Sequence, residues 1–478
     1  MTICDSNSDI ISHVPDNILE EILRCLPIQD AVRTSLLSRK WRYAWVKLPQ
    51  LVFDNMFYKD LHRLTQAKVL TIIYQVLLLH RGPIIKFTLS LSGLESCSEI
   101  DQLILFVSDN AIEDFELRIW KGELYKLPSS LYSSLQLKHL NLHSCMLKPP
   151  PGFGGFTNLR SLYLYEVVIA DDVLSSLISS CLLLEELILD SLISIDSLEV
   201  VGPNLKSVNC EGHFRSICFT NTSRLEDVTL YLKGTRKKLL FSEGEISSSV
   251  VLLDCVPAID FLGLDSSYVK GIAASGVLTR LPTTLNNLKN ICLYDICFGE
   301  QDEVYVLICL IRSSPNLEEI FIHAFPSETS AIRIDLDFLE ECGCSDVSLN
   351  KLRKVEMKNV SGAQPEQDFI KLLLAKSPML ETMLIGLKAQ NVADGLRFSA
   401  KAPKSPSIVV SNPEAIKPKT CCKIEGSCTP VVVGRRQAKV RIVGVRDRDD
   451  GDWVTKKRRR TLQIYEDLEL EFAAMAKP

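Results

Sequence analysis

Two histidines four residues apart are the first residues of the chain whose types and spacing suggest chemistry. His139 and His143 are followed by Cys145, and imidazole and thiolate groups are common zinc ligands. Zinc proteases place such a pair on a helix, with a glutamate directly after the first histidine. Here no glutamate follows His139, and the apolar residues of LKHLNLHSC alternate as in a strand. The sequence therefore favours ordinary positions on the exposed face of a strand over a metal site.

Other motifs lack residues that their chemistry would require. The glycine-rich PGFGG at 151–155 has no following Lys-Ser/Thr pair, so it predicts a turn rather than a phosphate-binding loop. The cysteines of 342–344 and 421–428 have no second pair at zinc spacing. Asn221 and Asn359 begin glycosylation sequons, which matter only in a secreted protein. No Ser, His and Asp grouping stands out, and we expect neither catalytic residues nor a metal or cofactor.

Composition restricts the class of protein. The 478 residues are 46% hydrophobic and 24% charged, which is typical of a globular chain long enough for several domains. The N-terminal MTICDSNSDI does not resemble a secretory signal, and the longest apolar run, Val69–Leu79, is too short to cross a bilayer. Sixteen scattered cysteines suit a reducing compartment. We therefore expect a protein of the nucleus or cytoplasm with no membrane partner.

Charge divides the chain into two unlike parts. The whole chain has a net charge of −5, which makes nucleic acid an improbable general partner. Residues 399–478 contain 17 Lys and Arg against 10 Asp and Glu, a net of +7, which leaves 37 against 49, or −12, in residues 1–398. The end of the chain, 411–478, is accordingly predicted to be a basic, disordered tail.

A short apolar pattern recurs through most of the chain. The triplet apolar-x-x-apolar-x-apolar begins at Ile84, Ile112, Leu137, Leu159, Leu184, Leu205, Leu225, Ile259, Leu288, Leu317, Leu352 and Leu380. Many of the intervals fall within the 20–29 residues of leucine-rich repeats, in which a strand alternates with a return segment. The alternative is one α/β domain in which strands and helices alternate.

The strand pattern also predicts which side chains face outward. Leu140 and Leu142 would point into the core, and the histidines and Asn141 between them would point outward. A helix is expected in a return segment that begins at Asp171, with this residue as its N-cap. Most repeats lack the Asn or Cys that normally follows the strand, for which Cys145 is a match, so we expect an irregular solenoid.

Three short helices are predicted before the repeats. Pro15 begins the first helix, which bears an apolar stripe from Ile18 to Leu26, and Pro27 ends it. Asp30 is expected to cap a second helix, and Trp41 and Trp45 lie four residues apart on a third. Because so few residues cannot bury this much apolar surface alone, a partner is implied.

These segments carry a resemblance to a known family. Residues 9–53, with the run PIQDAVRTSLLSRKWRYAW, closely resemble the F-box of plant proteins, and the repeats look like the leucine-rich repeats of the same proteins. Residues 352–385 are similar to the FBD module that ends them. The resemblance implies an α/β architecture in which a three-helix F-box at 9–55 precedes an irregular leucine-rich-repeat solenoid at 84–345 and an FBD module at 346–400.

The resemblance also implies a function. F-box proteins select substrates for SCF-type cullin ubiquitin ligases, so the expected partners are a Skp-type adaptor, the cullin scaffold and an unknown protein substrate. The motif positions that would contact the adaptor or brace the contact are Val14, Pro15, Ile18, Leu19, Ile22, Leu23, Leu36, Leu37 and Trp41. Val14 departs from the family, which has Leu there. Two alternatives stay open: the stripe packs internally against the repeats, or the chain is a repeat-based interaction scaffold outside the ligase whose helices serve as a cap.

Two further sites are predicted. Outward positions of the repeats would bind the substrate, with candidates His139, Asn141, Tyr163, Tyr165, Ile188 and Phe321, unless a loop or the FBD segment covers them. The basic run Lys456, Lys457, Arg458, Arg459 and Arg460 is a nuclear-import candidate, although such runs also arise by chance in basic tails.

Overall fold

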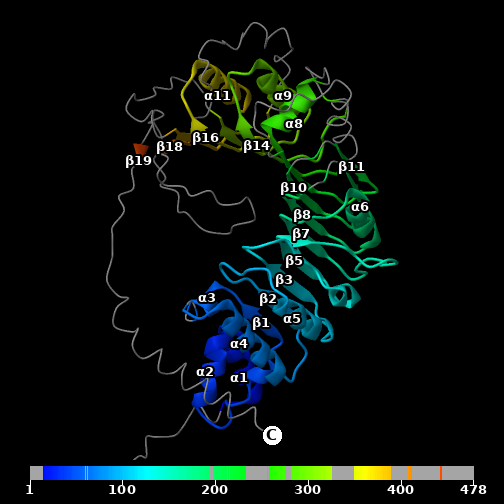
Figure 1. Ribbon diagram of the computed structural model, residues 1–478. Helices are drawn as coiled ribbons and strands as arrows, with labels where there is room; N and C mark the ends of the chain where they lie inside the picture. The colour runs from blue at the N-terminus through cyan, green and yellow to red at the C-terminus, as the bar shows by residue number, and fades with distance from the viewer. Residues whose placement is uncertain are drawn as a thin grey trace, which may run out of the picture.

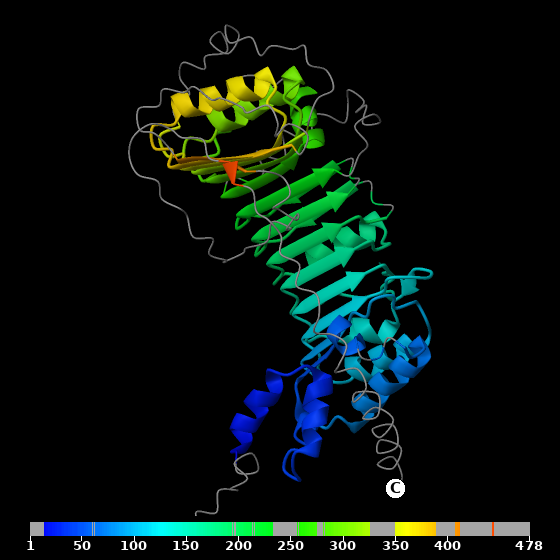
Figure 2. The same cartoon turned by 90° about the vertical axis from the view of Figure 1, so that its left-hand side faces the viewer.

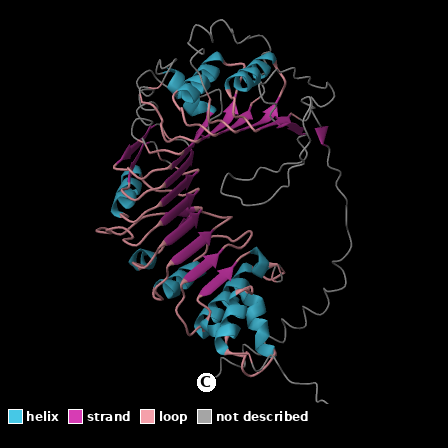
Figure 3. Cartoon of the chain, turned by 180° about the vertical axis from the view of Figure 1, so that it is seen from behind, coloured by secondary structure: helices cyan, strands magenta, loops and turns pink. Residues whose placement is uncertain are grey.

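The chain forms an arc with helices at its N-terminal end (Figure 1). The computed structural model describes residues 14–388, apart from 60, 62, 194, 196, 213, 215, 233–255, 257, 275–280, 282 and 326–348, and also 407–411 and 442–443. One parallel sheet lines the inner side of the arc, and most helices of the repeats lie on its outer side (Figure 3). Each strand pairs only with its neighbours, as in a solenoid.

The strands of the sheet lie side by side in the order in which they follow one another along the chain (Figure 2). Their bounds are β1 Gln50–Phe53, β2 Lys86–Leu89, β3 Asp114–Arg118, β5 His139–His143, β7 Ser161–Tyr165, β8 Glu186–Asp190, β10 Ser207–Gly212, β12 Asp227–Leu232, β13 Phe261–Asp265, β14 Asn290–Ile296, β15 Glu319–Ala324, β16 Lys354–Val360, β17 Thr382–Leu387, β18 Ser407–Ser411 and β19 Ile442–Val443.

The predicted repeats are confirmed strand by strand. Each of the twelve apolar starts lies two residues before a strand, from β2 to β17, and each is buried. Leu140 and Leu142 are buried as predicted, because alternate residues of β5 face the core. The repeat array is therefore the correct description of the fold.

The array begins earlier and ends later than its predicted bounds. Leu48, Leu51 and Phe53 carry the same apolar pattern, and β1 lies within the predicted F-box and pairs with β2. At the other end, β16 and β17 continue the sheet beyond β15. In the described structure the predicted F-box, the repeats and the segment predicted to be an FBD module therefore share one core.

The return segments are partly helical and partly extended. The α-helices are α1 Asp16–Arg24, α2 Ile28–Arg33, α3 Asn55–Tyr58, α4 Gln66–Leu79, α5 Glu99–Ser108, α6 Asp171–Ser180, α8 Ser266–Ala274, α9 Gln301–Arg312 and α11 Gln364–Lys376. Other returns are the short strands β4 Tyr125–Lys126, β6 Cys145–Met146, β9 Ser197–Val201 and β11 Ser216–Thr220, which form two small sheets. The helix predicted from Asp171 is α6, but Ala170 is its N-cap and Asp171 accepts a hydrogen bond from the backbone of Ser197 instead.

Two predictions for the F-box helices were wrong. Pro27, not Asp30, is the N-cap of α2, and Asp30 lies in its first turn, 2.9 Å from Arg33. The third helix is replaced by tight turns that include 3-10 segments at Thr34–Leu36 and Trp45–Lys47. Both tryptophans are buried there, and short backbone bonds of the 3-10 type hold the turns.

Candidate interaction sites

Large apolar side chains of the F-box remain exposed. Ile18 and Ile22 of α1 are 47% and 39% exposed, and Leu36, Leu37 and Tyr43 of the following turns are 62%, 54% and 59% exposed. We call these five residues the F-box apolar face. Lys40 joins the turns to α1, because its Nζ lies 3.0 Å from Asp16 Oδ1 and donates to the backbone oxygen of Val14. Exposed apolar side chains in this density are typical of a surface that another protein covers.

The nine predicted adaptor positions fall into two groups. Pro15, like Ile18, Ile22, Leu36 and Leu37, is exposed, and Val14 is half-buried. Leu19, Leu23 and Trp41 are buried in the core shared with the repeats. Internal packing is thus the role of these three, which hold α1 in place beneath its exposed residues. Tyr43 belongs to the apolar face but was missed, because its helix was placed incorrectly.

The predicted substrate positions lie on the inner face of the sheet but do not form one cluster. Asn141, Tyr163 and Ile188 are aligned on β5, β7 and β8, and all three are half-buried. Tyr165 lies one row further along, whereas Phe321 lies on β15, five strands beyond β8 in the sheet. His139 is exposed, and its Nδ1 lies 3.1 Å from Ser161 Oγ.

The histidines and Cys145 do not converge on a common point. The ring of His143 is buried between Trp120 and Tyr165, with ring centres 4.8 and 4.3 Å away. Cys145 is buried and donates to the backbone oxygen of His143, and burial raises the pKa of this thiol to about 12. Among all the described residues, no group of three or more His, Cys, Asp or Glu side chains could hold a metal ion.

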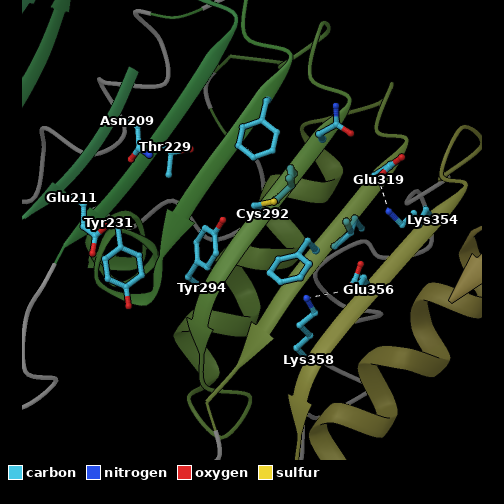
Figure 4. A pocket seen from close by; sticks show the side chains of 15 residues that line it. Asn209, Glu211, Thr229, Tyr231, Cys292, Tyr294, Glu319, Lys354, Glu356 and Lys358 are labelled. Atoms are coloured by element: carbon cyan, nitrogen blue, oxygen red, sulfur yellow. Dashed lines mark hydrogen bonds and ion pairs between the residues drawn. The ribbon is translucent and has the colours of Figure 1, made fainter. Parts of the chain in front are cut away.

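A pocket of about 620 Å³ lies on the inner face over β10 to β16 (Figure 4). Its aromatic residues include Tyr231, Tyr294 and Phe321, whose neighbouring ring centres are 5.9 and 6.0 Å apart. Glu211 and Glu356 also line it. Of these residues only Phe321 was a predicted substrate position; the others were identifiable only as outward positions of their repeats, which requires the register of each strand.

The basic side chains of the pocket are already paired. Lys354 Nζ lies 3.3 Å from Glu319, and Lys358 Nζ lies 3.2 Å from Glu356 (Figure 4). Lys358 also lies 5.0 Å from the centre of the Phe321 ring, within cation–π range. At this end of the pocket, positive charge is therefore compensated within the protein.

A hydrogen bond fixes Tyr231 at the pocket's other end. The hydroxyl of Tyr231 donates to Asp295 Oδ2 at 2.6 Å, and the other carboxylate oxygen lies 3.0 Å from His323 Nδ1. Burial, reinforced by the bond to Asp295, raises the pKa of Tyr231 well above its ordinary value. Tyr231 is therefore a neutral donor at physiological pH, with its ring held on the sheet face.

The glycine-rich segment is structural. Phe153 and Phe156 pack against each other and against Tyr132, with ring centres 5.0 to 6.3 Å apart. Gly152 and Gly155 have positive φ angles of 82° and 84°, as the predicted turn requires.

Nothing in the described part of the chain is a helix long and apolar enough to cross a membrane. The basic run at 456–460 and the cysteines of 342–344 and 421–428 lie outside the described residues.

Comparison with known proteins agrees with this architecture. Residues 11–53 match the F-box domain, and residues 100–322 match the family described as FBD-associated F-box protein At5g56370, LRR repeats. F-box/FBD/LRR-repeat protein At1g13570 of Arabidopsis thaliana is 36% identical over 409 residues, which are 83% of this chain and 97% of that protein. The chain belongs to the plant F-box/FBD/LRR-repeat family.

More distant members of the family align over similar lengths. F-box/FBD/LRR-repeat protein At3g26920 of Arabidopsis thaliana is 25% identical over 67% of this chain and 76% of its own length. Putative F-box/LRR-repeat protein At4g15060 of the same plant is 26% identical over 76% of this chain and 91% of its own length. The family identity agrees with the order of F-box helices and repeats along the arc.

Proposed function

We propose that this F-box/FBD/LRR-repeat protein is the substrate-recognition subunit of an SCF-type cullin ubiquitin ligase. The F-box apolar face would bind a Skp-type adaptor, which joins the cullin scaffold, and the inner face of the repeats would bind the target protein. The protein contributes binding surfaces and no catalytic residues of its own, as is typical of F-box proteins. We place this function in the nucleus or cytoplasm.

The observation that carries the proposal is the exposure of apolar residues on a well-packed support. Ile18 and Ile22 alternate along α1 with the buried Leu19 and Leu23, so one side of the helix packs on the core and the other meets solvent. Leaving such side chains in water forgoes about 1.5–3 kcal/mol each relative to burial. A partner that covers them recovers this free energy.

The competing function is a repeat scaffold that works outside the ligase. The pairing of β1 with β2 favours it, since the F-box helices do close the N-terminal end of the sheet. A cap alone, however, requires only Leu19, Leu23 and Trp41. It does not require exposed leucines at 36 and 37, so the two functions predict different effects of substituting them.

The test is binding of the full chain to a purified Skp-type adaptor, measured by calorimetry. Ile22→Asp combined with Leu37→Asp should weaken binding at least about 100-fold. Each substitution places a charge where the adaptor would bury an apolar side chain, and the charge would lose its water. The matched control is Leu182→Asp, which changes a leucine that is 60% exposed on the repeats. Adaptor binding that is undetectable for the wild type, or equal for all three proteins, would contradict the proposal.

A further inference from the structure

The pocket on the inner face lies over a row of small residues. Thr229, Gly263 and Cys292 are aligned partners on β12, β13 and β14, and the first and last of them line the pocket. Gly263 contributes no side chain to the sheet face. A Cβ atom there would lie 2.8 Å from Thr229 Oγ1, so a larger residue would push Thr229 out into the pocket. The short side chains of this row therefore leave the hollow open.

Aromatic rings surround the hollow. Phe321 on β15 is the aligned partner of Cys292, and Tyr294 lies two residues further along β14. The ring of Tyr294 is 5.9 Å from that of Tyr231 and 6.0 Å from that of Phe321, with the planes tilted by 70° and 53° (Figure 4). Phe261, at the beginning of β13, also lines the pocket. Rings tilted in this way offer both edges and faces to a further ring placed among them.

The charged groups that line the pocket interact within the protein. Each of its two lysines lies 3.3 or 3.2 Å from a glutamate, and Glu211 also has an interaction partner. The hydroxyl of Tyr231 donates to Asp295. A charged ligand would have to compete with these pairs or lose its water without gaining a counterion. An uncharged group could contact the rings and leave every pair intact.

We infer that this pocket binds an uncharged aromatic side chain of the target protein. The inference rests on the proposed function, in which the inner face binds the target, and it adds the chemical class of the recognised group. The volume of about 620 Å³ lies within the range of roughly 300–1,000 Å³ that is usual for ligand pockets, so a bulky side chain fits. Aromatic groups are favoured over aliphatic ones because contacts between rings add attraction beyond burial alone.

The experiment is a saturation-transfer NMR titration of the full chain, without adaptor, against the N-acetyl amides of tryptophan, leucine, lysine and glutamate. These amides lack terminal charges, as a residue within a chain does. We expect the tryptophan amide to bind at least about tenfold more tightly than the lysine and glutamate amides, and about threefold more tightly than the leucine amide. Equal affinity for all four amides, or no binding of the tryptophan amide, would overturn the inference.

Removal of a ring assigns the binding to the pocket. Tyr294→Leu should weaken the tryptophan amide at least about threefold, because an apolar side chain remains but the ring contacts are lost. The control is Trp120→Leu, which removes a ring that is 46% exposed after β3, outside the pocket. If Trp120→Leu weakens binding as much as Tyr294→Leu does, the amide binds to exposed rings in general and the inference fails.

A second variant fills the hollow instead of removing a ring. Thr229→Leu places a larger side chain above the row of small residues and should weaken the tryptophan amide at least about fivefold. Thr382→Leu is the matched control, because Thr382 is also half-buried but lies on β17, outside the pocket. Circular dichroism verifies that both variants are folded. Equal affinity of the two variants would contradict binding over Thr229.

The competing occupants are the chain's own Trp453, outside the described residues, and a second copy of the chain. If Trp453→Ser tightens the tryptophan amide about fivefold or more, the pocket belongs to that residue and not to a target. If the affinity falls when the protein concentration is raised about tenfold, a second copy fills the pocket. We expect neither change. Because the adaptor is absent from these titrations, their failure leaves the adaptor test untouched, and the two proposals can fail separately.

Discussion

Glu303 is fully buried in the first turn of α9, and its Oε1 lies 3.4 Å from Nζ of Lys270 on α8. The other carboxylate oxygen accepts a hydrogen bond of 2.8 Å from the backbone N–H of Cys297, directly after β14. One side chain thus joins a strand end, the helix that follows it and the neighbouring helix. A buried carboxylate is tolerated only where such partners replace water.

Glu303→Ala is expected to lower the free energy of unfolding by about 3 kcal/mol, because it leaves the N–H of Cys297 and the cation of Lys270 without their partner. The measurement is the shift of the urea midpoint followed by circular dichroism. Asp302→Ala is the matched control in the same helical turn, where the side chain is exposed, and should change stability by less than about 0.5 kcal/mol. Equal shifts for both variants would contradict this account.

Glu366 has the corresponding position in the first turn of α11. Its carboxylate accepts hydrogen bonds from the N–H groups of Ser361, Gly362 and Ala363 at 3.1, 2.6 and 3.0 Å, and from the hydroxyl of Ser361 at 2.9 Å. The side chain is buried, and it satisfies N–H groups that have no partner within the helix. The repeats at β14 and β16 therefore use the same device to begin a helix.

Glu366→Ala should cost about 2–3 kcal/mol of stability, and Glu366→Gln less, since the amide keeps one acceptor oxygen. Urea unfolding of both variants measures the difference. Glu381→Ala, an exposed glutamate in the loop before β17, should have almost no effect. If the alanine and glutamine variants were equally stable, charge and hydrogen bonding at this position would be irrelevant.

The strands were predictable because burial imposes a strict pattern on them. The first residue of each apolar triplet, such as Leu137 or Leu317, fills the space between two repeats. A polar side chain there would be buried without water to hydrogen-bond to it. Leu48 obeys the same rule, although its segment resembles an F-box, for which helices are expected. The pattern itself was sufficient to find β1.

The return segments and the F-box turns were less predictable. They lie on the outer side of the array, where either a helix or an extended strand can cover the core, as α6 and β9 do in successive repeats. Trp41 and Trp45 fit a helical spacing, yet two large rings bury equally well from tight turns. Tertiary packing, not local propensity, decides such segments.

The sequence predicted which kinds of site the chain has, but not which residues belong to each site. Apolar residues at 18, 22, 36 and 37 were expected at the adaptor surface, whereas the burial of Leu19, Leu23 and Trp41 depends on where the first repeat packs. Tyr231 and Glu211 become neighbours only through the pairing of β10 with β12. That register joins residues 20 positions apart, so neither residue alone marks the pocket that both line.

Glu185 connects three successive repeats at the beginning of their strands. Its carboxylate lies 2.6 Å from Arg160 and 2.7 Å from Lys206. The hydrogen bond from Lys206, with a further one from Arg160, lowers the pKa of Glu185 below its ordinary value. Because all three side chains are partly exposed, solvent screens the pairs, and we expect Glu185→Gln to cost less than about 1 kcal/mol.

The cost of Glu185→Gln should depend on pH in a defined direction. Since the pKa of Glu185 is lowered in the folded state, its stabilising contribution is complete above the ordinary value near 4.5 and is lost as the pH falls through the folded value. Unfolding midpoints measured between pH 7 and pH 3 should therefore converge for the wild type and the variant. Midpoints that stayed equally far apart at pH 7 and pH 3 would contradict a stabilising role of the charge on Glu185.

Three glycines of the turn before β7 differ in their backbone conformation and in the space available for a side chain. Gly155 has a φ of 84°, and a Cβ atom there would lie 2.5 Å from Cβ of Ser180 at the end of α6. Gly152 has a φ of 82° but open space around it, and Gly154 has open space without a positive φ. Alanine at each position therefore adds a different combination of costs.

Gly154→Ala should leave stability unchanged or raise it slightly, because alanine restricts the unfolded chain. Gly152→Ala should cost about 1 kcal/mol for the left-handed backbone, and Gly155→Ala clearly more, since α6 must also move away from the turn. Thermal unfolding of the three variants ranks them. If Gly152→Ala and Gly155→Ala had equal effects, the close approach to Ser180 would not constrain this repeat, and backbone conformation alone would account for both glycines.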